Sequence, residues 1–365
     1  MNRPLRILHV NPEHTQRGGE RQCRLLIQAQ LMQGHLPELF AASAPAWWES
    51  LQSEKVDITY LHGRGGLQVR GLIALRRRLL RGDVDVLHLH SAHAHTLGRV
   101  ASLGLSVPLV VHRRVDFQPG MTWLSRWKYL GKQQTYICVS HAIYRILLAA
   151  GIPSDWLHVV HSAVENPPIL GLEPRQRLLT VLGLNGSWPL LGCIGQLVPH
   201  KNQRLAVEAL PDIVAEHPRA KLLLVGDGPE RRWLEGCVAA LGLSAKVVFL
   251  GERREATDIL QLMDLLLVPS REEGLNTSIQ DAQWLGVPVV AAAVGGIPEL
   301  VQPERGWLLQ ATGPHDFAQG ILTALANRGE RVERSLRARA WIEAQGGVAR
   351  MASDVERIYR YVLRK

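Results

Sequence analysis

An acidic loop that leads into a helix carries the clearest chemical signal in this sequence, at residues 268–300. Backbone N–H groups at a helix start are unpaired and attract phosphate oxygens, so the start near Thr277 predicts a phosphate cradle. Glu273, just before it, would repel phosphate, but its carboxylate can accept hydrogen bonds from sugar hydroxyls. Asp281 follows eight residues later, about 12 Å along the helix axis, and could accept hydrogen bonds from a second polyol. Together these residues predict a nucleotide-sugar site.

The elements that hold this loop follow from the spacing of apolar and turn residues. A strand ends at Val268, a helix runs from about Thr277 to a stop at Gly286, and a β-branched strand covers residues 287–290 before a Gly-Gly turn at 295–296. A strand, a loop, a helix and another strand in this order form the unit of a parallel α/β sheet. The site is therefore predicted on an α/β domain.

The same segment resembles the C-terminal signature of the retaining GT-B glycosyltransferases of family four. That signature reads Ser-x-x-Glu-Gly, six residues, Glu-Ala, then Gly-x-Pro-Val-Val-Ala and Gly-Gly-x-x-Glu. One position differs, because Asp281 stands where the family usually has Glu and is shorter by one methylene. The matching residues are Ser270, Glu273, Gly274, Ala282, Gly286, Pro288, Val289, Val290, Ala291, Gly295, Gly296 and Glu299.

The resemblance implies an α/β fold of two Rossmann-like domains that face each other across a cleft, with the last helix crossing back to the first domain. It implies that the second domain binds the nucleotide sugar, that Glu273 orients the sugar and that Asp281 holds the ribose. The donor-binding segment at the helix start would consist of Gly274, Leu275, Asn276 and Thr277.

A length of 365 residues exceeds the usual size of one hydrophobic core and predicts two domains. We place an acceptor-side domain at residues 1–167 and a Pro- and Gly-rich linker at 168–188. The nucleotide-sugar-binding domain is placed at 189–345, and the returning helix at 346–365.

Charge is concentrated in the first half of the chain. Residues 1–167 hold 19 Lys and Arg against 11 Asp and Glu, a net of +8, whereas the remainder holds 23 against 22. The excess is explained equally by attraction to an anionic surface, such as the inner face of the cytoplasmic membrane, and by a solvated Arg-rich surface. A helix predicted over residues 67–82 allows the same two interpretations, membrane contact or a solvated outer face, because Arg77 and Arg78 fall outside its apolar arc.

Several features point to the cytoplasm. Apolar runs are too short to span a bilayer, the first residues lack the apolar core of a secretory signal, and the four cysteines are scattered. We expect a cytoplasmic protein that is peripheral on the membrane at most. A nucleic-acid partner is not expected, because the basic pI of about 9.7 comes without an aromatic-basic motif.

A Gly-Gly pair follows the first predicted strand, Arg6–Asn11. Glycine allows a backbone to approach a ligand closely, although a plain tight turn also fits. In the family that the chain resembles, a Gly-Gly-x-Glu or similar loop faces the donor diphosphate. Gly18 and Gly19 match it, with Glu20 as an acceptor-side candidate.

Four histidines gather at the end of the strand predicted over residues 85–90: His88, His90, His93 and His95. Alternate residues of a strand share a face, which suggests zinc, but no cysteine accompanies them and loop histidines would have to be placed accurately. We therefore predict no metal. The resemblance favours acceptor-side or structural roles, with His90 and His93 as acceptor-side candidates.

Another histidine, His112, ends the strand predicted over residues 107–112. A side chain at the carboxyl end of a parallel strand points to the crevice where α/β proteins bind ligands, although a buried His bonded to backbone is the alternative. The resemblance places a His here beside the transferred sugar and so makes His112 a catalytic candidate. Arg113, Arg114 and Asp116 follow as candidates to meet an anionic acceptor.

The second domain supplies the remaining candidates. Lys201 matches the family lysine that neutralises the donor diphosphate, and Gly226 lies in a Val-Gly-Asp-Gly-Pro turn typical of the family. Gln196 stands where the family prefers Arg, so neutralisation would rest on Lys201 and on helix-terminus amides.

The resemblance covers essentially the whole chain and implies a hexosyltransferase. It would move a sugar from an NDP-sugar to a glycan or glycolipid with retention, in lipopolysaccharide or surface-polysaccharide synthesis, and would need no cofactor beyond that co-substrate. A GT-B nucleotide-sugar epimerase and a catalytically impaired sugar-nucleotide-binding scaffold protein, the latter suggested by Gln196 and Asp281, are the alternatives. The donor sugar, its base and the acceptor are not indicated by the residues.

Overall fold

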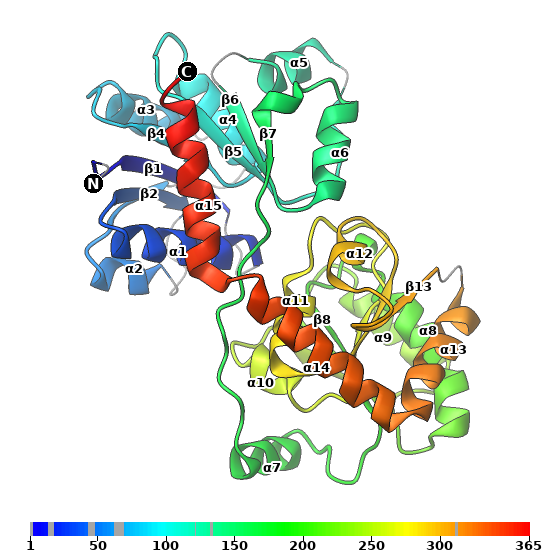
Figure 1. Ribbon diagram of the computed structural model, residues 1–365. Helices are drawn as coiled ribbons and strands as arrows, with labels where there is room; N and C mark the ends of the chain where they lie inside the picture. The colour runs from blue at the N-terminus through cyan, green and yellow to red at the C-terminus, as the bar shows by residue number, and fades with distance from the viewer. Residues whose placement is uncertain are drawn as a thin grey trace. The chain divides into compact units, whose positions relative to one another are not determined.

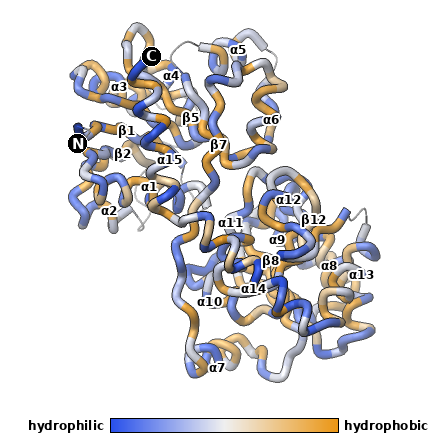
Figure 2. The backbone as a smooth tube through the Cα atoms, in the orientation of Figure 1, coloured by the Kyte–Doolittle hydropathy of each residue, from blue (hydrophilic) through white to orange (hydrophobic). Residues whose placement is uncertain are grey.

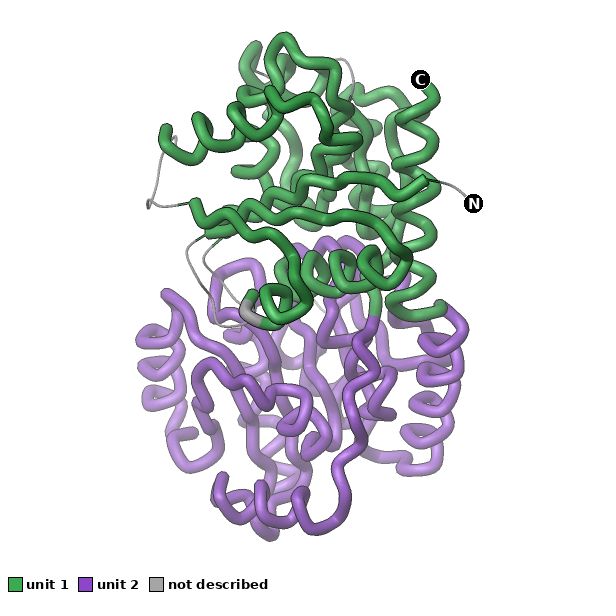
Figure 3. The backbone as a smooth tube through the Cα atoms, turned by 90° about the vertical axis from the view of Figure 1, so that its left-hand side faces the viewer, with its two compact units in different colours: residues 1–163, 346–365 green, residues 164–345 purple. Residues whose placement is uncertain are grey.

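The computed structural model describes residues 3–13, 18–42, 48–61, 69–120, 122–131, 134–310 and 313–365. It divides into two compact units, shown in separate colours in Figure 3. Unit 1 comprises residues 1–163 and 346–365, and unit 2 comprises residues 164–345. The segment 168–188, treated above as a linker, belongs to unit 2 and contains helix α7 (Leu172–Val181).

Unit 1 is built on a seven-stranded parallel sheet in the order β3-β2-β1-β4-β5-β6-β7. Its strands are largely buried, as expected of a parallel sheet covered on both faces by helices. The strands are β1 (Arg6–Asn11), β2 (Leu36–Ala42), β3 (Asp57–Leu61), β4 (Val86–Leu89), β5 (Leu109–Arg113), β6 (Gln134–Cys138) and β7 (Leu157–Val159).

The helices of unit 1 follow the strands in alternation (Figure 1). Two of them begin with a serine side chain that accepts the hydrogen bond of an otherwise unpaired backbone N–H: Ser91 before α4 and Ser140 before α6. The helices are α1 (Gly18–Met32), α2 (Glu49–Ser53), α3 (Val69–Leu79), α4 (Ala92–Ala101), α5 (Trp123–Tyr129), α6 (His141–Ala149), a 3-10 turn at Ser154–Trp156, and α15 (Gly347–Val362).

Helix α3 differs from the expectation for its outer face. Arg78, expected outside the apolar arc, is buried and pairs with Glu38 at 2.6 Å and with Asp83 at 2.6 Å. Ile73, an apolar residue of the same helix, is 45% exposed. The paired carboxylates explain the burial of a guanidinium, because a buried charge needs a partner.

The last helix, α15, returns to unit 1 as expected. It shares a core cluster with β1 and α1, and Figure 1 shows it in red beside α1. The buried residues that it contributes are Met351, Ala352, Val355, Ile358 and Tyr359. An apolar stripe at helical spacing therefore closes one face of the unit 1 sheet.

Unit 2 is a six-stranded parallel sheet in the order β10-β9-β8-β11-β12-β13. The neighbouring strands β11 and β12 are buried over their whole length. The strands are β8 (Leu190–Ile194), β9 (Lys221–Val225), β10 (Val247–Gly251), β11 (Leu265–Val268), β12 (Val289–Ala292) and β13 (Trp307–Leu309).

The helices of unit 2 surround this sheet. Figure 2 shows hydrophilic stretches along α14, whose outer face carries ion pairs between successive turns. No helix of the described residues is long and apolar enough to span a membrane. Besides α7, the helices are α8 (Gln203–Glu216), α9 (Arg231–Ala240), α10 (Ala256–Leu260), α11 (Thr277–Leu285), α12 (Ile297–Leu300), α13 (Pro314–Ala326), α14 (Arg328–Ala344) and a 3-10 turn at Pro199–Lys201.

The packing of α15 generates a prediction about stability. Met351 is 3% exposed, whereas Met32, at the end of α1, is 88% exposed. Met351→Ala should lower the free energy of unfolding by about 2–5 kcal/mol, because it removes buried methylenes and leaves a cavity. Met32→Ala is the matched control and should change it by less than about 0.5 kcal/mol. Urea unfolding measures both, and equal effects of the two changes would contradict the packing of α15.

Candidate functional site

Most of the candidate residues of unit 2 lie around the point where its strand order reverses. The chain passes from β8 outward through β9 and β10, then returns to β11 on the other side of β8. The carboxyl ends of two strands on either side of such a reversal leave room for a ligand in open α/β sheets. Gly195 and Gln196 follow β8 here, and Ser270 and Glu273 follow β11.

An ion pair joins these two loops. The Nζ atom of Lys201 lies 2.5 Å from Oε2 of Glu273, and both side chains are largely shielded, at 21% and 10% exposed. The same oxygen accepts from Nδ2 of Asn276 at 3.1 Å and from Oγ of Ser270 at 3.4 Å. Hydrogen bonds from three directions therefore fix the Glu273 carboxylate, and through it the position of the Lys201 ammonium.

Asn276 links the carboxylate to the start of α11. Its Oδ1 accepts from the backbone N–H of Ile279 at 3.1 Å and caps the helix, while its Nδ2 donates to Glu273. The helix begins at Thr277, as predicted, and ends at Gly286 with φ of 73°. The segment Gly274, Leu275 and Asn276 is buried, and Thr277 is partly exposed.

Glycines allow backbone segments to approach each other at this site. A Cβ on Gly295 would lie 1.9 Å from the carbonyl oxygen of Glu273, and the φ of Gly295 is +52°. The N–H of Gly296 donates to that same carbonyl at 2.9 Å. Gly226 is similarly constrained, because a Cβ there would lie 2.1 Å from the carbonyl oxygen of Gly195. Both turns therefore require glycine.

Two further candidates lie beside this core of the site. The backbone carbonyl of Gln196 accepts from Nε2 of Gln203 at 2.9 Å, and the Gln196 side chain is partly exposed. Asp281 lies on α11 and is 7% exposed. The structure thus keeps both residues in the same unit as Lys201 and Glu273.

Unit 1 brings its candidates together at an equivalent reversal, between β1 and β4. Gly18, Gly19 and Glu20 open α1 after β1, and Glu20 is 6% exposed. His90 follows β4, and His112 lies near the carboxyl end of β5. A Cβ on Gly19 would lie 3.4 Å from Cδ of Arg114, so the Gly-Gly segment packs directly on that side chain.

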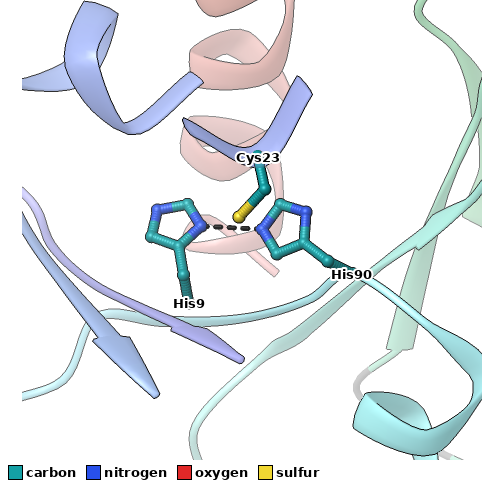
Figure 4. A group of neighbouring side chains, drawn as sticks. All are labelled: His9, Cys23 and His90. Carbon is teal, nitrogen blue, oxygen red and sulfur yellow. Dashed lines mark hydrogen bonds between the residues drawn. The ribbon is translucent and has the colours of Figure 1, made fainter. Parts of the chain in front are cut away.

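A continuous chain of hydrogen bonds runs through the interior of unit 1. Nη1 of Arg114 lies 3.2 Å from Nδ1 of His90, and its Nη2 lies 3.2 Å from Nδ1 of His112. Nε2 of His90 lies 2.9 Å from Nδ1 of His9, as Figure 4 shows, and Nε2 of His9 lies 2.8 Å from Oε1 of Gln30. These imidazoles are 0–5% exposed.

A second branch connects this chain to α15. Nε2 of Gln30 donates to the hydroxyl of Tyr359 at 3.1 Å, and that hydroxyl lies 2.5 Å from Nδ1 of His88. His9, Gln30 and Tyr359 were not identified as polar partners from the sequence. The only signal was the placement of a histidine and a glutamine among the apolar positions of a buried strand and of the helix that follows it.

Burial keeps these imidazoles uncharged. Desolvation lowers the pKa of His9 to about 4, and it lowers the pKa values of His88, His90 and His112 well below the ordinary range. The nearby Arg114 cation adds to the lowering at His112 and also contributes at the other three. At neutral pH the network therefore contains neutral histidines beside one cation.

The residues in this network fit a metal ion poorly. Figure 4 shows Cys23 against His9 and His90, a neighbour that was not anticipated, and His88, His90 and His112 form a second compact group. A metal on Nε2 of His90 would move the ring proton to Nδ1, where Arg114 already donates. Burial also raises the pKa of the Cys23 thiol to about 12, which disfavours the thiolate that binds metals.

The other acceptor-side candidates point in different directions. Arg113 is 4% exposed and donates from Nη1 to the Tyr129 hydroxyl at 3.1 Å, with its guanidinium over the Phe117 ring at 3.8 Å. The side chain of His93 is 81% exposed, and its Nδ1 lies 3.1 Å from Glu13. Asp116 is partly exposed in the segment after β5. Arg113 is thus directed into unit 1, and His93 toward solvent.

Two family models match the chain, one mainly in unit 1 and the other in unit 2. "Glycosyltransferase Family 4" matches residues 16–166, and "Glycosyl transferases group 1" matches residues 188–327. The fold is also that of solved structures, among them the Anabaena protein HepE in complex with UDP-glucose, with a TM-score of 0.86 at 20% identity over 98% of this chain and 100% of that chain. Two parallel-sheet units of this kind define the GT-B class.

Within that class, the chain belongs to the family-four glycosyltransferases and is a hexosyltransferase. One relative is the N-acetyl-alpha-D-glucosaminyl L-malate synthase of Bacillus anthracis, 28% identical over 78% of this chain and 76% of that protein. Another is the UDP-Gal:alpha-D-GlcNAc-diphosphoundecaprenol alpha-1,3-galactosyltransferase of Escherichia coli, 25% identical over 70% of each.

The buried imidazoles predict that stability falls with acid. The folded protein keeps His9 neutral down to a pKa of about 4, whereas an unfolded His takes up a proton near pH 6.5. Stability should therefore be full above pH 6.5 and fall as the pH drops toward 4, by roughly 3 kcal/mol from His9 alone. Urea unfolding at several pH values measures this loss.

The matched variants are His9→Gln, which cannot take up a proton, and His93→Gln on the exposed side chain. His9→Gln should flatten the dependence on pH, while His93→Gln should leave it as in the unchanged protein. A slope that His9→Gln does not alter would show that this buried imidazole does not cause the acid loss.

Proposed function

We propose that this glycosyltransferase moves a sugar from a nucleoside diphosphate sugar to a glycan or glycolipid acceptor with retention at the anomeric carbon. The observation that carries the proposal is the ion pair between Lys201 and Glu273 beside the start of α11. A cation, a carboxylate and unpaired helix N–H groups at one strand reversal match the phosphates and the hydroxyls of such a donor.

Each group has a place in donor binding. The Lys201 ammonium has three hydrogens, of which one is directed at Glu273, so the others can be donated to phosphate oxygens. The three described donors to Glu273 all lie on Oε2, so a sugar hydroxyl would be received by Oε1. Asp281 is assigned to the ribose hydroxyls. The nucleotide would contact the backbone of four residues: Gly226, Gly274, Leu275 and Thr277.

The chemical step that we propose is the one that the resemblance to the retaining family implies. The bond between the anomeric carbon and the diphosphate oxygen breaks while the acceptor hydroxyl oxygen forms its bond on the same face of the sugar. The acceptor proton passes to an oxygen of the departing diphosphate. Lys201 and the N–H groups at residues 274–278 would stabilise the negative charge that develops on the diphosphate. His112 of unit 1 is assigned to contact the sugar that is transferred.

The acceptor is proposed from the relatives. The Escherichia coli relative is named for transfer of galactose to a diphosphoundecaprenol-linked sugar. A lipid-linked sugar or growing glycan of lipopolysaccharide or another surface polysaccharide is therefore the acceptor class that we favour. The positive charge of residues 1–167 suits an acceptor that carries phosphate.

Calorimetric titration with the UDP, GDP and ADP derivatives of common sugars tests the donor site. One sugar nucleotide should bind, and Lys201→Met or Glu273→Gln should weaken its binding about tenfold or more, or about 1.4 kcal/mol. Glu272→Gln is the matched control, because its exposed side chain precedes Glu273 in the same loop. If the unchanged protein binds none of these compounds, the proposal is refuted.

Gly295→Ala tests the backbone of the same loop. Its Cβ would lie 1.9 Å from the Glu273 carbonyl oxygen, so the loop must shift and donor binding should weaken about tenfold or more. Gly236→Ala in α9, where a Cβ meets nothing within 4 Å, should leave binding unchanged. Equal affinities of the two variants would argue against a donor site at Glu273.

A further inference from the structure

Arg114 occupies an unusual position between two neutral histidines. One end of its guanidinium, Nη1, lies 3.2 Å from Nδ1 of His90 and 3.3 Å from the His90 carbonyl oxygen. The other end, Nη2, lies 3.2 Å from Nδ1 of His112. Arginine has only donors and stays protonated, so each of these imidazole nitrogens must present a lone pair. The single proton of each ring must then be on Nε2.

The remainder of the network agrees with this assignment. A proton on Nε2 of His90 is donated to Nδ1 of His9, which leaves the His9 proton on its own Nε2. That atom faces Oε1 of Gln30, which can only accept. Every link from Arg114 to Gln30 therefore has one donor and one acceptor. A proton on Nδ1 of His90 would set two donors against each other at its contact with Arg114.

We propose that Arg114 is a positioning residue for the sugar transfer, which holds His112 as the neutral tautomer with its proton on Nε2. His112 then offers a permanent N–H donor to an oxygen of the transferring sugar. This inference rests on the proposed function for the contact of His112 with the sugar. It also gives Arg114 a role other than the expected contact with an anionic acceptor, because its guanidinium donates hydrogen bonds to His90 and His112.

The groups around His112 support a neutral ring. The ring centroids of His88 in β4 and of His90 just after it lie 5.5 Å and 5.9 Å away, and both rings are neutral. The Arg114 cation repels a proton on His112, and His9 of β1, which also acts on it, is neutral above its pKa of about 4. Tyr359 of α15 contacts His88, while Cys23 and the carboxylate of Glu20 on α1 interact with Arg114. These are the titratable and charged groups of the described network.

Removing the guanidinium should lower the transfer rate, because nothing then fixes the tautomer of His112. In Arg114→Met, neutral His112 is free to carry its proton on Nδ1, which removes the donor at Nε2. We expect kcat to fall about tenfold at pH 8, less than the 10²–10³-fold loss typical of deleting a transition-state donor. The loss should be similar at pH 8 and pH 5.5, because burial is the largest cause of the lowered pKa of His112 and remains in the variant, so the ring stays neutral.

Two variants control for structural effects. Arg114→Lys keeps the charge but has no rigid fork to reach both rings, so it should give an intermediate loss. Tyr359→Phe breaks the same network at His88 and Gln30 without touching His112, so it should lower stability and leave kcat within about twofold of the unchanged protein. An Arg114→Met protein that keeps its full kcat, or in which His112 still carries its proton on Nε2 alone, would overturn the proposal.

The tautomer can also be measured without any transfer assay. Nitrogen NMR of the 15N-histidine-labelled unchanged protein, with the His112 signals assigned by His112→Asn, should show protonated Nε2 and unprotonated Nδ1 from pH 5.5 to 8. A protonated Nδ1 would refute the inference even if the enzyme transfers sugar. If the protein binds no sugar nucleotide, the proposed function fails, whereas the NMR result still decides the tautomer of His112.

Discussion

Polar groups that lie inside a parallel sheet must find partners there, and this constraint governs both units. An imidazole or carboxylate at the end of a buried strand loses its water, and leaving it unpaired costs about 1–3 kcal/mol or more. In unit 1 the histidines of β1, β4 and β5 are joined by Gln30, Arg114 and Tyr359. In unit 2 the carboxylate of Glu273 is held by Lys201, Asn276 and Ser270.

The two arrangements differ in what they leave for a ligand. Unit 2 pairs a cation with an anion, so its net local charge is small while both groups retain hydrogen-bonding capacity. Unit 1 contains neutral rings with one guanidinium, and the direction of its hydrogen bonds is set by that single donor-only group. On the proposed function, unit 2 would receive the phosphate and its sugar, and unit 1 would orient uncharged hydroxyls.

The sequence predicted the elements around the loops well, because apolar runs and turn glycines report directly on local structure. The α11 start at Thr277 and the glycine turn at 295 followed from such patterns, whereas Gly226 and the return of the last helix were expected from the family resemblance. Pairings across long stretches could not be predicted, since nothing local indicates which partner a side chain meets. Lys201 and Glu273 are 72 residues apart, and Gln30 and Tyr359 are 329 apart.

The same limit explains the positions where expectation and structure differ. Arg78 follows a helical pattern that places it outward, but Glu38 on a different strand provides the counter-charge that allows it to be buried. Cys23 is a lone cysteine in the sequence and becomes a neighbour of His9 only because α1 crosses the end of β1. Helical and strand periodicity describe one element at a time, whereas these contacts depend on how several elements pack.

The placement of α15 has a consequence for the order in which the protein can form during its synthesis on the ribosome. All strands of unit 1 precede residue 164, but the helix that covers Leu5, Ile7 and Val86 comes after the whole of unit 2. Domains generally fold in the order in which they emerge. Until the last helix emerges, one apolar face of unit 1 stays uncovered and His88 lacks its partner Tyr359. The second unit can fold in the interval.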